Sequence, residues 1–273
     1  MKALFLVFIL PFSFVSASGQ SIKILDPATI FQSGEVVRYK VSYNWGFIWV
    51  DAGVVKFEIN EGLENQQPFY QFKGVGRSLP KWDWIYQVRD IYESKSFKDN
   101  TLSPISFSRD VREGSTRILN TYEFNSKQKK IYSKRLNKEG HFDLDTLTHK
   151  TQVNDVLSLI YLARCFDYSN LNSGDSIPIK VLLDNEIHSI YVRFVGEEKV
   201  EIDGKGIIDC FVFKPYLMKG TIFNEGENMT VWVSKDLNRV PILVETSILV
   251  GSIKGIILDH KGLKHPLVFR QKK

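Results

Sequence analysis

The sequence has little cysteine and little excess charge, and each shortage excludes a class of protein. Only 2 of its 273 residues are cysteine, too few for a small domain stapled by disulfides. The 36 Lys and Arg residues exceed the 31 Asp and Glu residues by a net charge of +5, without the basic block expected of a nucleic-acid-binding protein. Hydrophobic residues make up 43% of the chain and aromatic residues 13%, which excludes a disordered protein.

Sequence patterns of several enzyme classes are also missing. The chain has no Gly-x-Ser-x-Gly turn and no phosphate-binding loop of the Walker type. Both Cys165 and Cys210 lie in apolar segments, which raise a thiol pKa and disfavour a cysteine nucleophile. Two alternatives stay open for them, a single disulfide bridge or two buried free thiols. No reaction follows from the sequence, and we expect neither a cofactor nor a bound metal.

The N-terminus has the pattern of an export signal. Met1-Lys2 is followed by the apolar run 3–15 and then by small residues. This order is typical of a cleaved secretory signal peptide, and the run is too short for a membrane anchor. We therefore expect residues 1–19 to be removed, with cleavage near Ala17 or Gly19, and a periplasmic or extracellular protein. No later apolar run approaches the ~20 residues of a membrane-spanning helix, so we expect no transmembrane segment in the mature chain.

Most of the mature chain alternates apolar and polar residues with a period of two, as strands with one buried face do. The pattern predicts about fourteen strands, at 35–43, 47–59, 68–74, 84–97, 102–111, 117–124, 130–135, 176–183, 187–195, 199–202, 206–214, 229–234, 240–249 and 252–258. Turn residues separate them, for example at 60–62 and at Asp184-Asn185.

One segment has a helical period instead. Its apolar residues fall at 153, 156, 157, 160 and 161, which predicts an amphipathic helix with Thr151 or Asn154 as N-cap. The fold class is therefore antiparallel all-β with one central helix, in barrel-like or half-barrel-like sheets rather than a flat sandwich. We expect one β-rich domain over residues 20–273, and the alternative is two β halves joined near 141–164.

Several short motifs occur in a characteristic order. They are Gly34-Glu35 followed by Val37, Tyr39, Val41 and Tyr43; Gly53; Asn154-Asp155-Val156-Leu157-Ser158 with Tyr161 and Arg164; Trp232-Val233-Ser234 and Asp236 with Arg239-Val240-Pro241; and Gly251-Ser252-Ile253. Together they resemble the DUF3108 family of exported bacterial proteins, in the style of members from the Bacteroidetes. The resemblance implies an exported, β-rich protein of unknown function. We interpret the shared residues first as determinants of the fold: Gly34, Glu35, Asp155, Trp232, Asp236, Arg239 and Pro241, with Arg239 paired to Asp155 or Asp236.

Two groups of polar residues have the composition of a chemical site. The first, with residue types that suit a divalent metal, consists of His141, Asp143, Asp145 and His149. Its spacing matches no zinc motif, and we favour the interpretation of a solvated polar loop before the helix. The second is the carboxylate group Asp83, Asp90 and Glu93, as in glycoside hydrolysis. Period-two geometry, however, points Asp90 and Glu93 to opposite faces of a strand.

Tryptophan is concentrated in the first half of the mature chain. Flat rings can stack on sugars or line an apolar cavity, although strand aromatics more often fill a core. If the barrel is open, we expect ligand contacts from Trp45, Trp49, Trp82, Trp84, Arg77 and Arg89. The arginines suit an anionic head group or an acidic sugar. The leading hypothesis is a non-enzymatic exported module that binds an envelope lipid or glycan. The alternatives are a polysaccharide-active hydrolase or lyase and a protein-binding scaffold.

Export predicts a defined new N-terminus. When the full chain is expressed in a bacterial host, intact-mass measurement and N-terminal sequencing should find a mature protein that starts at Ser18 or Gln20. Bulky residues in place of Ala17 and Gly19 should block this cleavage, because the peptidase requires small side chains there. A full-length chain recovered from the cytoplasm would contradict the interpretation.

Overall fold

The computed structural model describes residues 22–45, 48–217, 225–248 and 251–271. The fourteen strands are β1 (Val36–Trp45), β2 (Ile48–Glu64), β3 (Gln67–Ser78), β4 (Arg89–Phe97), β5 (Pro104–Glu113), β6 (Thr116–Asn125), β7 (Lys130–Leu136), β8 (Phe142–Thr148), β9 (Ser176–Leu183), β10 (Glu186–Ile202), β11 (Gly206–Pro215), β12 (Met229–Ser234), β13 (Pro241–Ser247) and β14 (Ser252–Lys261). The helices are α1 (Pro27–Ile30), α2 (Val156–Arg164) and the 3₁₀ turns η1 (Pro80–Trp82) and η2 (Tyr168–Asn170).

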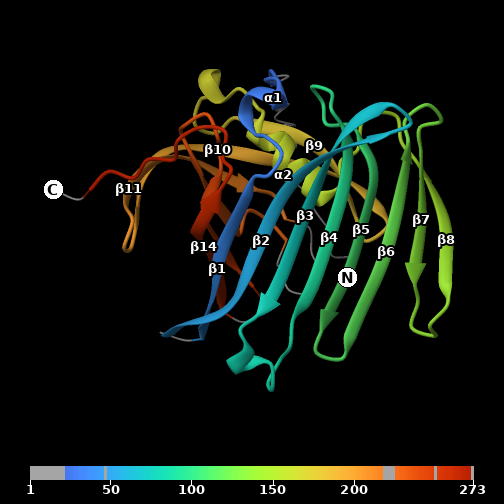
Figure 1. The fold of residues 1–273 in the computed structure, drawn as a ribbon, viewed down its shortest axis with the longest axis horizontal. Coiled ribbons are helices and arrows are strands. Elements are labelled where there is room, and N and C mark those ends of the chain that lie inside the picture. The colour runs from blue at the N-terminus through green and yellow to red at the C-terminus, as the bar shows by residue number, and fades with distance from the viewer. Residues whose placement is uncertain (1–21, 46–47, 218–224, 249–250, 272–273) are drawn as a thin grey trace, which may run out of the picture.

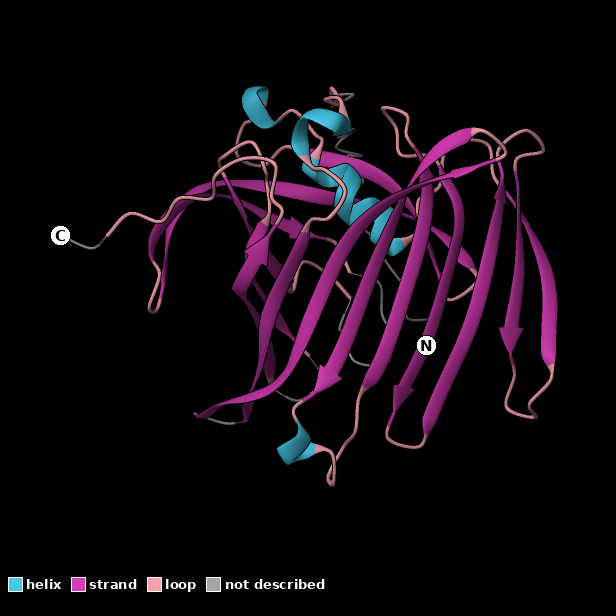
Figure 2. Ribbon diagram, viewed as in Figure 1, coloured by secondary structure: helices cyan, strands magenta, loops and turns pink. Residues whose placement is uncertain are grey.

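All fourteen strands belong to one antiparallel sheet. Its order runs from β8 through consecutive neighbours to β1, then from β14 back to β9, so that β1 and β14 join two meanders. In Figure 1, β1–β8 form a broad wall, and the β9–β14 half curves round behind its upper end. Figure 2 shows α2 lying across that upper end, between the two halves. The prediction of a barrel-like all-β fold with one central helix is confirmed.

Strand boundaries differ from the prediction in three places. β8 replaces the expected polar loop, because an exposed edge strand needs no apolar alternation. β10 runs through the two strands predicted at 187–195 and 199–202, with an irregularity at Gly196. The segment 84–88 lies in the connection between η1 and β4 rather than in a strand.

The turn predicted at 60–62 lies inside β2. Gly62 pairs with Phe69 across the ladder, and a Cβ at Gly62 would lie 2.5 Å from the Phe69 ring, so this glycine makes room for the ring. The chain turns instead at Asn65-Gln66, with φ of 51° and 64°. The hairpin turn predicted at Asp184-Asn185 is confirmed, with φ of 46° and 67°.

The start of α2 is tied to the sheet. Its N-cap is Asp155, not the predicted Thr151 or Asn154, and the Asp155 carboxylate accepts the backbone N–H of Ser158 at 3.0 Å in a capping box. The hydroxyl of Ser94 in β4 donates to the other carboxylate oxygen at 2.8 Å. Burial raises the pKa of Asp155, and these hydrogen bonds oppose that effect.

The end of α2 is held by a buried ion pair. Arg164 is 4% exposed and Glu35 is 1% exposed, and their two hydrogen bonds are 2.5 and 3.0 Å long. The remaining Nε–H of Arg164 donates to the carbonyl of Asn238 between β12 and β13, at 2.9 Å. The guanidinium also lies over the rings of Phe31 and Tyr161, at 5.4 and 5.5 Å. One side chain therefore joins the helix to the entry of β1 and to the second half of the sheet.

Arg239 lies near this ion pair but pairs with neither predicted carboxylate. It donates to the carbonyl of Phe166 and stacks over the ring of Tyr168 at 5.1 Å. Asp155 caps the other end of α2, and Asp236 accepts hydrogen bonds within its own turn. The predicted pairing is wrong because the Arg239 guanidinium is held just past the C-terminal end of α2, by the Phe166 carbonyl and the Tyr168 ring.

Other shared motif residues make contacts at strand ends. The carbonyl of Pro241 accepts the Tyr39 hydroxyl at 2.9 Å, which links β13 to β1. The indole of Trp232 donates to Glu198 at 2.7 Å. Gly34 takes a φ of 86° just before β1, a conformation that favours glycine. These contacts agree with the interpretation of the motif residues as fold determinants. That interpretation stays a prediction.

The two cysteines are free thiols, buried in different apolar clusters. Cys165 packs in the cluster around α2, and Cys210 packs in the cluster between β10, β11, β13 and β14. Burial raises the pKa of both thiols to about 12, so neither forms a thiolate at neutral pH. Of the two alternatives for the cysteines, the free thiols are the one found.

Breaking the Arg164–Glu35 pair should destabilise the protein strongly. Glu35→Gln leaves a buried guanidinium without its counter-charge, at a cost of about 3–5 kcal/mol in the free energy of unfolding. Asp259→Asn is the matched control, because it breaks the exposed pair with Arg38, which is worth less than about 1 kcal/mol. Urea unfolding of both variants measures the difference. Equal losses would show that the buried pair has no special role.

Candidate functional site

A band of polar side chains crosses the inner face of β4–β7, below the core that packs against α2. Strand register places Tyr92, Arg109, Asn120 and Arg135 opposite one another on four neighbouring strands. In the adjacent row toward the core, Tyr122 of β6 stands opposite Ser133 of β7. These residues form the polar belt: Tyr92, Arg109, Asn120, Tyr122, Ser133 and Arg135.

The hairpin turn between β9 and β10 reaches across to this region. Asp184 accepts a hydrogen bond from Arg109 at 2.5 Å, and Asn185 donates to Asp145 of β8 at 2.8 Å. β8 and β9 are the two end strands of the sheet. Among the described strands, β8 and β9 form no ladder with each other. Side chains of the turn therefore connect the two ends of the sheet.

Asn120 links the belt internally. Its side-chain oxygen accepts from Arg109 Nε at 3.2 Å and Nη2 at 2.9 Å and from the Tyr122 hydroxyl at 3.3 Å, in the amide orientation that satisfies both ends. Its side-chain nitrogen then donates to the carbonyl of Leu119 at 3.0 Å. Asp184 and Asn120 thus hold the guanidinium of Arg109 within the protein.

The Arg135 side of the belt has polar groups that lack a partner. Among the described residues, the side-chain atoms Ser133 Oγ and Arg135 Nε are buried and have no hydrogen-bond partner. Ser133 is only 3% exposed. A buried polar group left unpaired costs about 1–3 kcal/mol, so these two atoms are candidates for contact with a bound water, ion or ligand. Exposure increases toward the sheet edge, where Asp143 and Asp145 are open to solvent. The belt is therefore accessible from the β8 side.

Asp90 lies on the same inner face, closer to the strand ends. Burial raises its pKa to about 6, and the negative charge of the nearby Glu113 adds to the shift, while the N–H of Arg112 opposes it. Glu93 points to the outer face, where it pairs with Lys73 at 2.6 Å. The predicted opposite orientation of Asp90 and Glu93 is confirmed, and these two carboxylates do not form one site.

Trp49, Trp82 and Trp84, three of the predicted tryptophans, lie toward one rim of the barrel, near the starts of β2 and β4. Trp49 lies on the outer face, opposite Asn44 of β1. The indole N–H of Trp82 donates to the carbonyl of Asp51 at 2.8 Å, which ties the two connections together. Trp84 is 81% exposed. The side chain of Trp45 lies outside the described residues.

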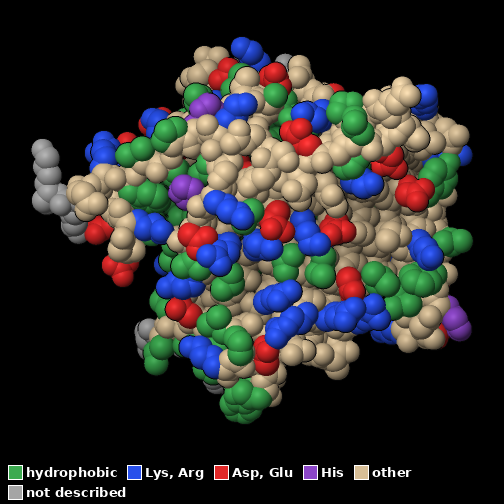
Figure 3. All heavy atoms as spheres, viewed as in Figure 1, with side chains coloured by type: hydrophobic (Ala, Val, Ile, Leu, Met, Phe, Trp, Pro, Cys, Tyr) green, Lys and Arg blue, Asp and Glu red, His purple; other side chains and the backbone are tan. Residues whose placement is uncertain are grey.

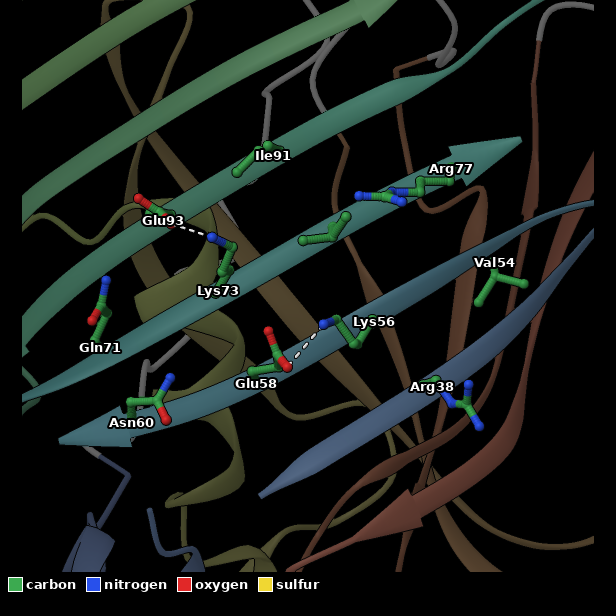
Figure 4. A pocket seen from close by; sticks show the side chains of 11 residues that line it. Arg38, Val54, Lys56, Glu58, Asn60, Gln71, Lys73, Arg77, Ile91 and Glu93 are labelled. Carbon is green, nitrogen blue, oxygen red and sulfur yellow. Dashed lines mark hydrogen bonds and ion pairs between the residues drawn. The ribbon is translucent and has the colours of Figure 1, made fainter. Parts of the chain in front are cut away.

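The predicted arginines are brought together at the same rim. Arg77 and Arg89 stand opposite each other on β3 and β4. Arg89 forms an ion pair with Asp83 at 2.5 Å, and hydrogen bonds from Arg89 and Ser78 lower the pKa of that carboxyl. Arg77 forms no salt bridge among the described residues and lies at one end of a shallow groove on the outer face of β1–β4 (Figure 4). Ion pairs within the groove, such as Lys73–Glu93, neutralise much of its floor.

The candidate metal ligands have separate partners. Asp143 accepts from Asn137 at 2.9 Å, and Asp145 is held by Asn185. His149 Nδ1 lies 2.8 Å from the carbonyl of Thr151. Within the described part of the chain, no three His, Cys, Asp or Glu residues come together as a set of metal ligands.

This architecture, one strongly curled antiparallel sheet with a helix across one end, defines a β-barrel-like protein. The chain is similar to the crystal structure of a β-barrel-like protein of the domain of unknown function DUF1849 from Brucella abortus, with a TM-score of 0.53 and 11% identity. The match covers 86% of this chain and 100% of the other, and at this identity it shows a shared fold. Among the described residues, no helix has the length and apolar content needed to cross a membrane.

The family model of DUF3108, a protein of unknown function, matches residues 38–257. The chain belongs to this family, as the motif resemblance predicted. No curated protein matches it in sequence.

Asp90 should give the protein a pH-dependent stability. Because its folded pKa of about 6 lies above the unfolded value of 3.8, the folded state binds more protons in that window, and stability falls as the pH rises through it. Asp90→Asn should remove this loss, about 1–2 kcal/mol after allowance for solvent screening at a half-buried site. Urea unfolding at pH 4 and pH 7 measures it. Glu93→Gln is the outer-face control, and a wild-type pH slope in Asp90→Asn would contradict the assignment.

Proposed function

We propose that this DUF3108 protein is an exported envelope protein that binds a lipid or a glycan without altering it, and that the polar belt receives the ligand's anionic group. The observation that carries the proposal is the pair of buried, unpartnered polar atoms, Arg135 Nε and Ser133 Oγ, on an inner barrel face that opens to solvent at β8. Export is supported by the leader pattern of residues 1–19.

The belt combines the groups that an anionic amphipathic ligand needs. Arg109 and Arg135 lie two strands apart, about 10 Å between backbones, with Asn120 between them. Arg109 is held by Asp184, so Arg135 is the arginine with hydrogen-bonding capacity left for a carboxylate or phosphate. Burial raises the pKa of Tyr92 to about 12, so it stays a neutral ring with a hydroxyl donor.

Apolar side chains adjoin the belt on the helix side. Phe107 stacks with both Tyr92 and Tyr122, at centroid distances of 6.4 and 6.0 Å. An acyl chain or a sugar ring can pack against these rings while its charged end meets Arg135. The arrangement fits a ligand with one apolar part and one anionic part.

Catalysis on a polysaccharide is the weaker alternative. The raised pKa of Asp90 is a property of general acids, which is the observation in its favour. The described residues around Asp90, however, show no second carboxylate set across an open cleft as the partner that a glycosidase requires, because the neighbouring Glu113 acts on the pKa of Asp90 itself. We therefore favour binding over turnover.

Native mass spectrometry of the mature protein, purified gently from the envelope, tests the proposal. An extra mass that leaves on denaturation should be present, and the value of that mass distinguishes a lipid from a glycan. Arg135→Gln should lower its occupancy about ten- to a hundredfold, as expected for the loss of a charged hydrogen bond.

Lys134→Gln is the matched control, because Lys134 is the preceding residue of the same strand and its side chain lies against Phe142, away from the belt. Two results would contradict the proposal. One is a clean apo mass combined with no binding of envelope lipids or acidic oligosaccharides in titration. The other is an Arg135→Gln variant that retains the wild-type load.

A further inference from the structure

Exposed apolar side chains project from the rim opposite α2. Ile85 is 59% exposed and Tyr86 52% exposed, next to Trp84 in the loop before β4. Ile48, 66% exposed, and Trp49, 42% exposed, lie at the same end of the barrel, at the start of β2. These five residues are called the rim tip. Figure 3 shows hydrophobic side chains at the lowest point of the molecule, where this rim lies.

The loop that carries the rim tip is held in place by polar contacts. The Trp82 indole is bound to the carbonyl of Asp51, and the backbone N–H of Leu79 donates to the carbonyl of Ala52 at 2.8 Å. The Ser78 hydroxyl donates to Asp83 at 2.5 Å. The apolar side chains are therefore presented outward by a fixed loop, rather than folded back on the barrel.

Several cationic side chains lie near the rim tip. The Nζ of Lys81 lies 5.2 Å from the Trp82 ring, and the Nζ of Lys254 lies 4.7 Å from the Trp49 ring. Two further cations, Arg77 and Arg89, stand side by side across strands, and Arg89 is paired with Asp83. Among the described residues, neither Lys81 nor Arg77 forms a salt bridge. Lys254 and Arg89 are each paired with a carboxylate, at 2.5 Å to Glu245 and to Asp83, so Lys81 and Arg77 are the two of these cations left for an anionic partner.

We propose that the rim tip docks on the surface of an anionic phospholipid membrane. Tryptophan and tyrosine rings favour the boundary between head groups and acyl chains, and nearby lysine and arginine side chains reach the phosphate layer. Exposed apolar side chains of this kind mark a protein or a membrane interface, and the neighbouring cations Lys81 and Arg77, which form no salt bridge among the described residues, favour an anionic membrane. The inference is independent of any ligand in the polar belt.

Sedimentation of the mature full chain with vesicles tests the docking. Binding should be strong with 7:3 phosphatidylcholine–phosphatidylglycerol and weak with phosphatidylcholine alone. The double variant Trp84→Ser, Ile85→Ser should bind at least tenfold more weakly, because two exposed apolar side chains no longer insert. Leu63→Ser is the control, since Leu63 is 76% exposed in the β2–β3 hairpin at the opposite end of β2.

The electrostatic part has its own variant. Arg77→Gln should weaken binding about fivefold at low salt, and the difference should shrink as salt rises. Thermal unfolding of every variant should match the wild type. Equal binding to neutral vesicles, or unchanged binding by the double variant, would overturn the proposal. A rim tip that joins two copies of the chain would also overturn the proposal. In that case light scattering would show a dimer that the double variant abolishes, and no vesicle binding would be seen.

Discussion

The buried ion pair between Arg164 and Glu35 is the interaction on which the rest of the structure depends. A single sheet of fourteen strands has one seam, between β1 and β14, at which its two meanders must meet. Glu35 precedes β1, and Asn238 lies in the turn before β13, so Arg164 fixes both sides near this seam to the end of α2. Because the pair is removed from water, either charge alone would be very costly, and the three segments are therefore constrained together.

This constraint makes the two ends of the barrel different. The start of α2 is fixed by the Asp155–Ser94 hydrogen bond and its end by Arg164, so the helix fills one end with an apolar core. Strands β4–β7 extend beyond that core, and their inner faces change from Phe107 and Tyr122 to Arg109 and other polar residues. The polar belt therefore lies where the strands extend beyond the helix. Its position is set by strand length as much as by residue type.

Local periodicity predicted the fold well, and the candidate site only in part. Period-two alternation found most strands because one face of each is buried, but it missed β8, whose side chains are nearly all open to solvent. Arg109 shares its parity with Phe107 and Val111, so a charge on an inner face was already visible in the sequence. That Arg109 lies in one row with Asn120 and Arg135, however, depends on the register of three strands, which no single segment encodes.

The tryptophans show the same limit of what local periodicity predicts. The apolar spacing around Trp84 predicted a strand with an inward ring, yet the chain leaves the sheet at Ser78 and returns only at Arg89. Trp82, Asp83 and Arg89 fix this connection through hydrogen bonds, and the side chains of Trp84, Ile85 and Tyr86 between them are exposed. An exposed cluster fixed in this way is a property of the folded chain, and it gives the end of the barrel opposite α2 a chemistry that the helix-filled end lacks.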